Sequence, residues 1–359
     1  MQSRTTVVML VTFSVMLAQA PVNVGRSPVE NVVALTNGRF VSADLNDILL
    51  VQDLGRIQLS SGPGGARPSV RLCRLSLVRT SGSKPRTVWQ SSPLLAEPAL
   101  TASVAANPWA AGDINADGLA ELLLPGPDSC RVVSFGPDSV RERVVPMPGA
   151  WPTDVVVCDL TEKLLPEIVT VELSPVSSTS GLLLRVYRFA DSAFVPVTDY
   201  ISGLDWNGNT NISFTGTCRL PDYYTEMPVL AATPAELKPS TYAVLAPAGP
   251  DSFRLTSNPF PVADWFSKTR VLPSGRLSMF NVGDTLVAWG YFVPGSRPSG
   301  PSSSFAALED GEWHLLELTE AAGRLAGPVC RFERNGTAGW LEYRDNCLWF
   351  YPGDVFSLR

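Results

Sequence analysis

Five oxygen donors at regular spacing in one short loop are the residues of this chain best suited to chemistry. They fill loop positions 1, 3, 5, 7 and 9, the fourth through its backbone carbonyl: Asp113, Asn115, Asp117, Leu119 and Glu121. Hard cations such as Ca²⁺ bind about six to eight oxygens, so this loop supplies most of a coordination shell. Gly118 permits the sharp turn that such a loop needs. The spacing predicts one calcium site; the alternative is a polar hairpin turn without a cation, since Asp, Asn and Gly favour turns.

The residues around this loop favour strands over helices. Its first half, D-x-N-x-D-G, also matches an EF-hand, but an EF-hand needs a Glu at position 12, where this chain has Leu124. The apolar run at residues 122–124 is short and is ended by Pro125 and Gly126, which is typical of a strand. We therefore expect a cation loop within a β-hairpin.

The stretch G-D-I-N-A-D-G-L-A-E-L-L, residues 112–123, resembles the signature of FG-GAP/VCBS-type repeats. Such repeats are found in integrin-α-like β-propellers, so the resemblance implies an all-β fold whose blades surround a central axis. In this interpretation the loop is architectural, because it pins a hairpin, and it is not evidence of catalysis.

Weaker copies of this unit recur along the chain at spacings of 46 to 69 residues. A four-stranded propeller blade takes roughly 40–50 residues plus insertions. Six anchor positions therefore predict a single β-propeller of about six four-stranded blades, or seven if the longest gap holds another: Asp44, Asp113, Asp159, Arg219, Asn281 and Arg331. Only the copy at Asp113 keeps a full ligand set. Lys163 could replace a cation in the third copy, and the arginines would repel one in the fourth and sixth.

The two ends of the chain are expected to close the ring. Residues 32–36 form an apolar run without a blade of its own, and residues 347–351 look like a third strand with little chain after it. We expect the N-terminal strand to supply the fourth strand of the last blade, which would remove exposed sheet edges. One propeller domain would then span residues 21–359.

Residues 1–20 are typical of a secretory signal peptide. Arg4 makes the start positive, residues 7–17 are apolar but too short for an ordinary transmembrane helix, and Ala18-Gln19-Ala20 offers a cleavage site. Pro21 disfavours a cut directly before it, so the segment is cleaved elsewhere or stays as an N-terminal anchor. We expect a secreted, periplasmic or cell-surface protein. A net charge of −6 and a pI near 5.0 argue against nucleic acid or an anionic membrane as partner.

Little in the sequence points to catalysis. The single histidine, His314, lies in an alternating segment that favours an outer strand, and no G-x-S-x-G, P-loop or C-x-x-C motif is present. The six cysteines are expected to be mostly free and buried. The alternative is that an exported chain such as this one holds one or two disulfides.

These observations favour a non-enzymatic binding or scaffold propeller, with no catalytic residues, that meets a protein or glycan ligand at one face. Two alternatives stay open. The first is a carbohydrate-binding lectin, for which Trp206 is the best candidate for an exposed platform. The second is a propeller polysaccharide lyase or hydrolase, which would need acid and base groups that converge at one rim or in the central channel.

Overall fold

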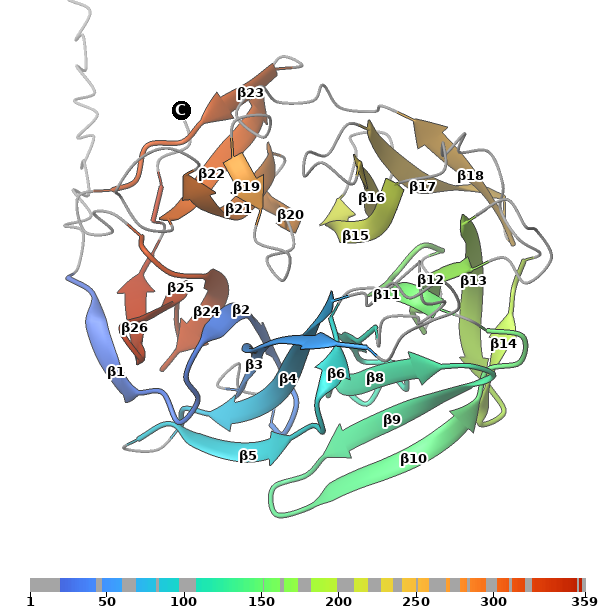
Figure 1. Ribbon diagram of the computed structural model, residues 1–359, viewed down its shortest axis with the longest axis horizontal. Helices are drawn as coiled ribbons and strands as arrows, with labels where there is room; N and C mark the ends of the chain where they lie inside the picture. Colours follow the sequence, from blue (N-terminus) through green and yellow to red (C-terminus); the bar gives the residue numbers. More distant parts are fainter. Residues whose placement is uncertain are drawn as a thin grey trace, which may run out of the picture.

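A computed structural model of the protein describes residues 20–42, 47–59, 69–81, 84–96, 108–150, 152–161, 165–173, 182–198, 210–218, 227–234, 241–249, 251–257, 269–271, 278–282, 285–294, 302–309, 312–319, 325–353 and 355–356. Its secondary structure there is all β, and Figure 1 shows the antiparallel sheets arranged around a ring. This confirms the all-β, propeller-type fold that the sequence predicts. Within the described residues, no helix is long and apolar enough to cross a membrane.

Three sheets from the first half of the chain are antiparallel meanders, in which strands that follow one another pair side by side. The first contains β2 (Val32–Gly38), β3 (Asp47–Gln58), β4 (Ser69–Arg79) and β5 (Arg86–Gln90), with β6 (Leu94–Leu95) also on β4. The second contains β7 (Ala110–Gly112), β8 (Glu121–Gly126), β9 (Ser129–Phe135) and β10 (Val140–Pro146). The third contains β11 (Pro152–Cys158), β12 (Glu167–Leu173), β13 (Leu182–Ala190) and β14 (Ala193–Pro196).

The second half of the chain forms two further sheets. In the larger one, two meanders are joined by one parallel pairing of Gly216 with Met279. Its strands are β15 (Thr210–Cys218), β16 (Met227–Pro234), β17 (Thr241–Gly249), β18 (Ser252–Ser257), β19 (Thr269–Val271), β20 (Ser278–Val282), β21 (Thr285–Pro294), β22 (Ser302–Glu309) and β23 (Glu312–Leu315). The last sheet contains β24 (Val329–Arg334), β25 (Thr337–Arg344) and β26 (Cys347–Pro352). The turn between β24 and β25 has positive φ at Asn335 and Gly336, which favours a tight hairpin.

The N-terminal strand lies against the end of the chain, where β1 (Val22–Arg26) pairs with β26 as the outer strand of the last sheet. Figure 1 shows the two strands side by side. The sequence-based choice of residues 32–36 for this closing strand was wrong. Those residues belong to β2, which pairs with β3 in the first sheet. The apolar run could not distinguish an inner strand from a closing strand, because both bury one face.

The core lies between neighbouring sheets, and the period-two alternation of each strand divides its side chains between two clusters. On β3, Ile48 and Leu50 pack in a cluster with the last sheet, while Leu49 and Val51 pack in a cluster with the second sheet. Inner strands approach closely where a small residue permits it. A Cβ on Gly112 would lie 2.5 Å from Val157 Cγ1, so the contact between β7 and β11 requires glycine there.

Several sequence-based predictions fall outside the described residues. They concern residues 1–19 of the predicted signal peptide and the following positions: Asp44, Lys163, Trp206 and Arg219. The five cysteines whose state the structure describes form no disulfide: Cys73, Cys130, Cys158, Cys330 and Cys347.

The closing strand should contribute measurably to stability through one side chain. Val24 is 7% exposed and packs in the core cluster between the first and last sheets, whereas Val22 on the same strand is 43% exposed. Val24→Ala removes two buried methyl groups and should lower the free energy of unfolding by about 2 kcal/mol. Val22→Ala is the matched control and should change it by less than about 0.5 kcal/mol. Chemical denaturation measures both, and equal effects would show that β1 is not packed as described.

Candidate functional site

A buried carboxylate begins the second strand of each of the first three sheets. The residues are Asp47 on β3, Glu121 on β8 and Glu167 on β12, and each is at most 2% exposed. The strand register makes these positions equivalent, because they pair with Gly38, Gly112 and Cys158, the last residues of the preceding strands. The residue after Gly38 is Arg39, so Arg39 is the counterpart of Asp113 and Asp159. The prediction of Asp44 as the first anchor was therefore wrong.

The same backbone contact holds all three carboxylates. An N–H from the preceding loop donates to one carboxylate oxygen: Val41 to Asp47 Oδ2 (2.9 Å), Ile114 to Glu121 Oε2 (3.2 Å) and Leu160 to Glu167 Oε2 (3.1 Å). These hydrogen bonds tie each loop to the strand that follows it.

An arginine on the third strand accompanies two of these carboxylates. Arg79 Nε lies 3.4 Å from Asp47 Oδ1, and Arg188 Nη2 lies 2.8 Å from Glu167 Oε1. Each arginine is the register partner of its carboxylate. In the second sheet, Leu122 pairs with Val133, so the next step of the ladder places Ser134 opposite Glu121. The second sheet therefore has no arginine in register with its carboxylate, although the positive charge of Arg143 on β10 lowers the pKa of Glu121.

Burial raises the pKa of Glu121 from its ordinary value of 4.5 to about 7. The negative charges of Asp117 and Asp113 raise this pKa further, while the hydrogen bond from the Ile114 N–H lowers it. The carboxyl group is thus half-protonated near neutral pH in the metal-free protein. A cation beside it would favour the charged form, as Arg79 and Arg188 do at the equivalent positions.

The predicted calcium ligands lie together in the described loop, but hydrogen bonds occupy them. Asp113 accepts from the N–H groups of Asp117 (3.2 Å) and Gly118 (2.8 Å), and Asp117 accepts from the N–H of Leu119 (2.8 Å). Ala116 and Gly118 both have positive φ, consistent with the expected sharp turn.

The Asn115 amide lies between the carboxylates of Asp117 and Glu121, two of the residues that would hold a cation. Its Nδ2 donates to Asp117 Oδ2 (3.1 Å) and to Glu121 Oε1 (2.9 Å). In the part of the chain that the structure describes, no three His, Cys, Asp or Glu residues converge as a metal site. The oxygen donors of this loop fit a hard cation. Because the Asn115 amide group already contacts Asp117 and Glu121, a cation would have to displace it from these carboxylates.

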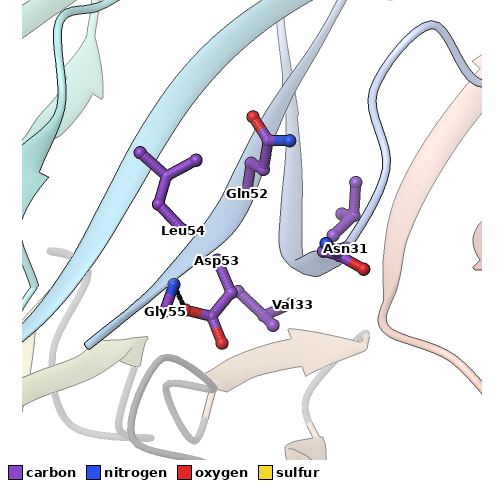
Figure 2. Close-up of a pocket in the computed structure, with 7 residues that line it drawn as sticks. Asn31, Val33, Gln52, Asp53, Leu54 and Gly55 are labelled. Atoms are coloured by element: carbon purple, nitrogen blue, oxygen red, sulfur yellow. Dashed lines mark hydrogen bonds between the residues drawn. The ribbon is translucent and has the colours of Figure 1, made fainter.

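A groove at the other end of β3 carries a second group of polar side chains. Its walls are Asn31, Val32, Val33, Gln52, Asp53, Leu54 and Gly55. Figure 2 shows Gln52 and Leu54 on one side of β3 and Asp53 on the other, as strand alternation requires. The groove thus combines one carboxylate and two amides with apolar side chains.

Three contacts hold Asp53 in place within the groove. Its Oδ1 accepts from the Gly55 N–H (2.9 Å), and its Oδ2 lies 3.8 Å from Arg71 Nη1. Its own N–H donates to the Asn31 carbonyl (2.9 Å), which joins the start of β2 to the end of β3. A positive φ at Gly55 and a bulge between Asp53 and Gly55 shape this end of the strand. The backbone hydrogen bonds and the charge of Arg71 therefore orient Asp53, whose side chain is 24% exposed.

The groove was missed in the sequence because its residues carry no motif. The available signal was the polar pair Gln52-Asp53 ahead of Gly55 at the end of an apolar run, a pattern that equally predicts a turn. The single histidine is placed as predicted, since His314 is exposed on the outer strand β23.

No protein-family model and no curated protein sequence matches this chain. Solved structures with a similar overall arrangement include an α-L-arabinanase from Penicillium chrysogenum in complex with arabinobiose. The arabinanase is 12% identical in sequence, the match covers 94% of this chain and 98% of the arabinanase chain, and the TM-score is 0.43. Another is the periplasmic gluconolactonase PpgL of Pseudomonas aeruginosa, 14% identical over 91% of this chain and 87% of its own, with a TM-score of 0.36.

The prediction that the protein is not an enzyme is contradicted by these structures, because both are of enzymes. Similarity at 12% and 14% identity concerns the fold alone.

The raised pKa of Glu121 predicts a pH dependence of stability in the metal-free protein. The folded-state pKa of about 7 lies above the ordinary 4.5, so the folded state binds the extra proton between these values. Stability should therefore fall as pH rises from 4.5 to 7, by roughly 3 kcal/mol in total. Urea denaturation in the presence of a chelator at several pH values measures it. Glu121→Gln should remove this slope, and Glu142→Gln, a change on an exposed strand, should keep it. Equal slopes for wild type and Glu121→Gln would contradict the assignment.

Proposed function

We propose that the protein is an exported β-propeller hydrolase that acts on a carbohydrate bound in the groove between β2 and β3. The observation that carries this proposal is the Asp53 carboxylate in the lining of the groove, which the Gly55 N–H and Arg71 hold in place. Small-molecule sites typically combine apolar walls with a few placed polar groups, and perturbed or oriented carboxylates mark candidate catalytic positions.

The polar groups of the groove suit a ligand rich in hydroxyls. A carboxylate accepts hydrogen bonds, and each amide both donates and accepts, which matches sugar hydroxyl groups that do the same. Val33 adds apolar surface to the lining, against which the C–H face of a sugar ring can pack.

Asp53 is our candidate for the group that moves the proton. In hydrolysis, the oxygen of one water forms a bond to the electrophilic carbon, and the bond from that carbon to the leaving oxygen breaks. A carboxylate can take the proton of the attacking water and return it to the leaving oxygen, so that the step is balanced. The Gly55 N–H and Arg71 fix the carboxylate for this role. The described lining holds this one carboxylate, so a second acid, where the substrate needs one, comes from outside the lining.

We propose further that the ring has six blades in one domain spanning residues 21–359, behind a signal peptide at residues 1–20. The support is the strand order, in which β1 with β24–β26, the three meanders of the first half and the two joined meanders each supply four strands. The FG-GAP/VCBS character of the repeats rests on the loop at residues 113–121.

We also propose one calcium ion in the loop of the second blade. The support is the position opposite Glu121, where Ser134 stands in place of an arginine, so that this buried carboxylate beside Asp113 and Asp117 has no arginine in register with it. The residues that would hold the ion are those predicted from the sequence: Asp113, Asn115, Asp117, Leu119 and Glu121. When bound, the ion would supply the positive charge that Arg79 and Arg188 supply in the neighbouring blades.

Loss of the Asp53 carboxylate should abolish hydrolysis without loss of the fold. Asp53→Asn keeps an oxygen that can accept from the Gly55 N–H, so we expect normal melting and a 10²- to 10⁴-fold lower kcat/KM. A panel of polysaccharides, assayed for new reducing ends, provides the substrate and the measurement. Asp138→Asn, in an exposed turn, is the matched control and should keep full activity. Cleavage of no polysaccharide by the wild type, or full activity in Asp53→Asn, would reject the proposal.

Calcium should bind at one equivalent and stabilise the protein. At a free concentration of 100 times Kd, one site adds roughly 2.7 kcal/mol to the free energy of unfolding. Calorimetric titration and thermal melting should both show this effect in the wild type and neither in Asp117→Ala. Ser134→Arg places a guanidinium opposite Glu121, so it should raise the stability of the calcium-free protein and weaken its response to calcium. No calcium response in the wild type would make the loop a polar turn.

A further inference from the structure

The turn between β24 and β25 carries an acceptor sequence for N-linked sugars. Asn335, Gly336 and Thr337 fit the pattern Asn-x-Thr, in which the middle residue is not proline. All three residues are exposed. A Cβ built on Gly336 would meet no described atom within 4 Å other than those of its two chain neighbours. The tip of this hairpin therefore has room for a bulky substituent.

The backbone of the turn suits an asparagine that carries a substituent. Asn335 has a φ of 52° and Gly336 a φ of 74°, in the left-handed region that asparagine tolerates better than most residues. Arg334 pairs with Thr337, so the two residues between them form the connection of a tight hairpin. A glycan on Asn335 breaks no hydrogen bond of the ladder, because this residue lies beyond the last pair.

A second acceptor pattern, Asn-x-Ser, is placed differently. It begins at Asn211 and ends at Ser213, within β15. Asn211 pairs with Thr233 in the ladder with β16, and β15 also pairs with β20 on its other edge. A glycan is bulky and hydrated and belongs on the surface. The structure therefore favours Asn335 over Asn211.

The turn and the groove lie at opposite ends of the strands. First strands of neighbouring meanders run parallel: β15 pairs in parallel with β20, and Gly112 at the end of β7 lies against Val157 near the end of β11. β24 is the first strand of its sheet, as β2 is of the first sheet, so the turn after β24 lies at the end of the ring where β2 ends. The groove lies where β2 begins. A glycan on Asn335 would therefore leave the groove open.

We infer that Asn335 is an N-glycosylation site of the exported chain and that Asn211 stays unmodified. The inference rests on the proposed export and does not depend on hydrolysis in the groove. The donor is a lipid-linked oligosaccharide diphosphate. The amide nitrogen of Asn335 forms a bond to the anomeric carbon of the first sugar, the bond from that carbon to the diphosphate breaks, and the amide loses one proton. Thr337 supplies the hydroxyl that the acceptor sequence requires.

The test secretes the full chain from an animal cell line and measures its mass before and after an amidase removes N-linked sugars. We expect one glycan, on Asn335. The amidase turns the glycosylated asparagine into aspartate, and the use of heavy-oxygen water labels that residue, which distinguishes it from spontaneous deamidation at the Asn335-Gly336 pair. Thr337→Val should lose the glycan, and Thr337→Ser should keep it. Both changes fall on an exposed position, so both variants should fold.

The outcomes separate this inference from the proposed function. A secreted chain without a glycan, a glycan only on Asn211, or a glycan that persists in Thr337→Val would overturn the inference and leave export in place. A chain that stays unmodified inside the cell would overturn both. Removal of the glycan should leave the rate of polysaccharide cleavage unchanged, and a clear change would overturn the placement of Asn335 away from the groove. A glycosylated chain that cleaves no polysaccharide would support the inference and reject the hydrolase.

Discussion

A carboxylate buried where the second strand begins is the constraint on which the loops of the first three sheets depend. Removing a charged carboxylate from water is costly unless hydrogen bonds and an opposite charge replace its hydration. The chain meets the first need in the same way each time, with a backbone N–H from the preceding loop. It meets the second with Arg79 or Arg188, each on the neighbouring strand and in register with its carboxylate.

The second sheet departs from this pattern in a way that is chemically consistent. Ser134 stands where the arginine would be, and the loop ahead of Glu121 carries Asp113, Asp117 and Asn115. Adding carboxylates around a buried acid raises its pKa unless a cation is also present. The serine in place of an arginine and the oxygen ligands of the loop are both consistent with the proposed ion, which would take the place of a fixed guanidinium.

The fold class and the sharp turn of the loop at residues 113–121 could be predicted from the sequence because they depend on local patterns, whereas calcium binding there stays a prediction. Short apolar runs separated by Gly, Pro and Asp indicate strands and hairpins, and one loop carries its whole ligand set within nine residues. The first anchor was misplaced because Phe40 and Val41 continue the apolar pattern beyond β2, although they lie in the loop. The pairs of Asp47 with Arg79 and Glu167 with Arg188 span 32 and 21 residues, so their register appears only once the strands are paired. The groove is likewise formed by cross-strand neighbours without a motif.

The strand pair β3–β4 carries both kinds of site, one at each end. Asp47 and Arg79 are register partners at one end, where the carboxylate is 1% exposed and stabilises the fold. Asp53 and Arg71 meet farther along the pair, beside a bulge and a glycine with positive φ, where the Asp53 side chain is 24% exposed. The same two residue types thus have different roles because of their burial: the enclosed pair fixes a loop, and the open pair can exchange part of its hydration for a ligand. The apolar residues 48–51 of β3, between Asp47 and Asp53, are packed in the core. This packing keeps rigid the strand that carries Asp53.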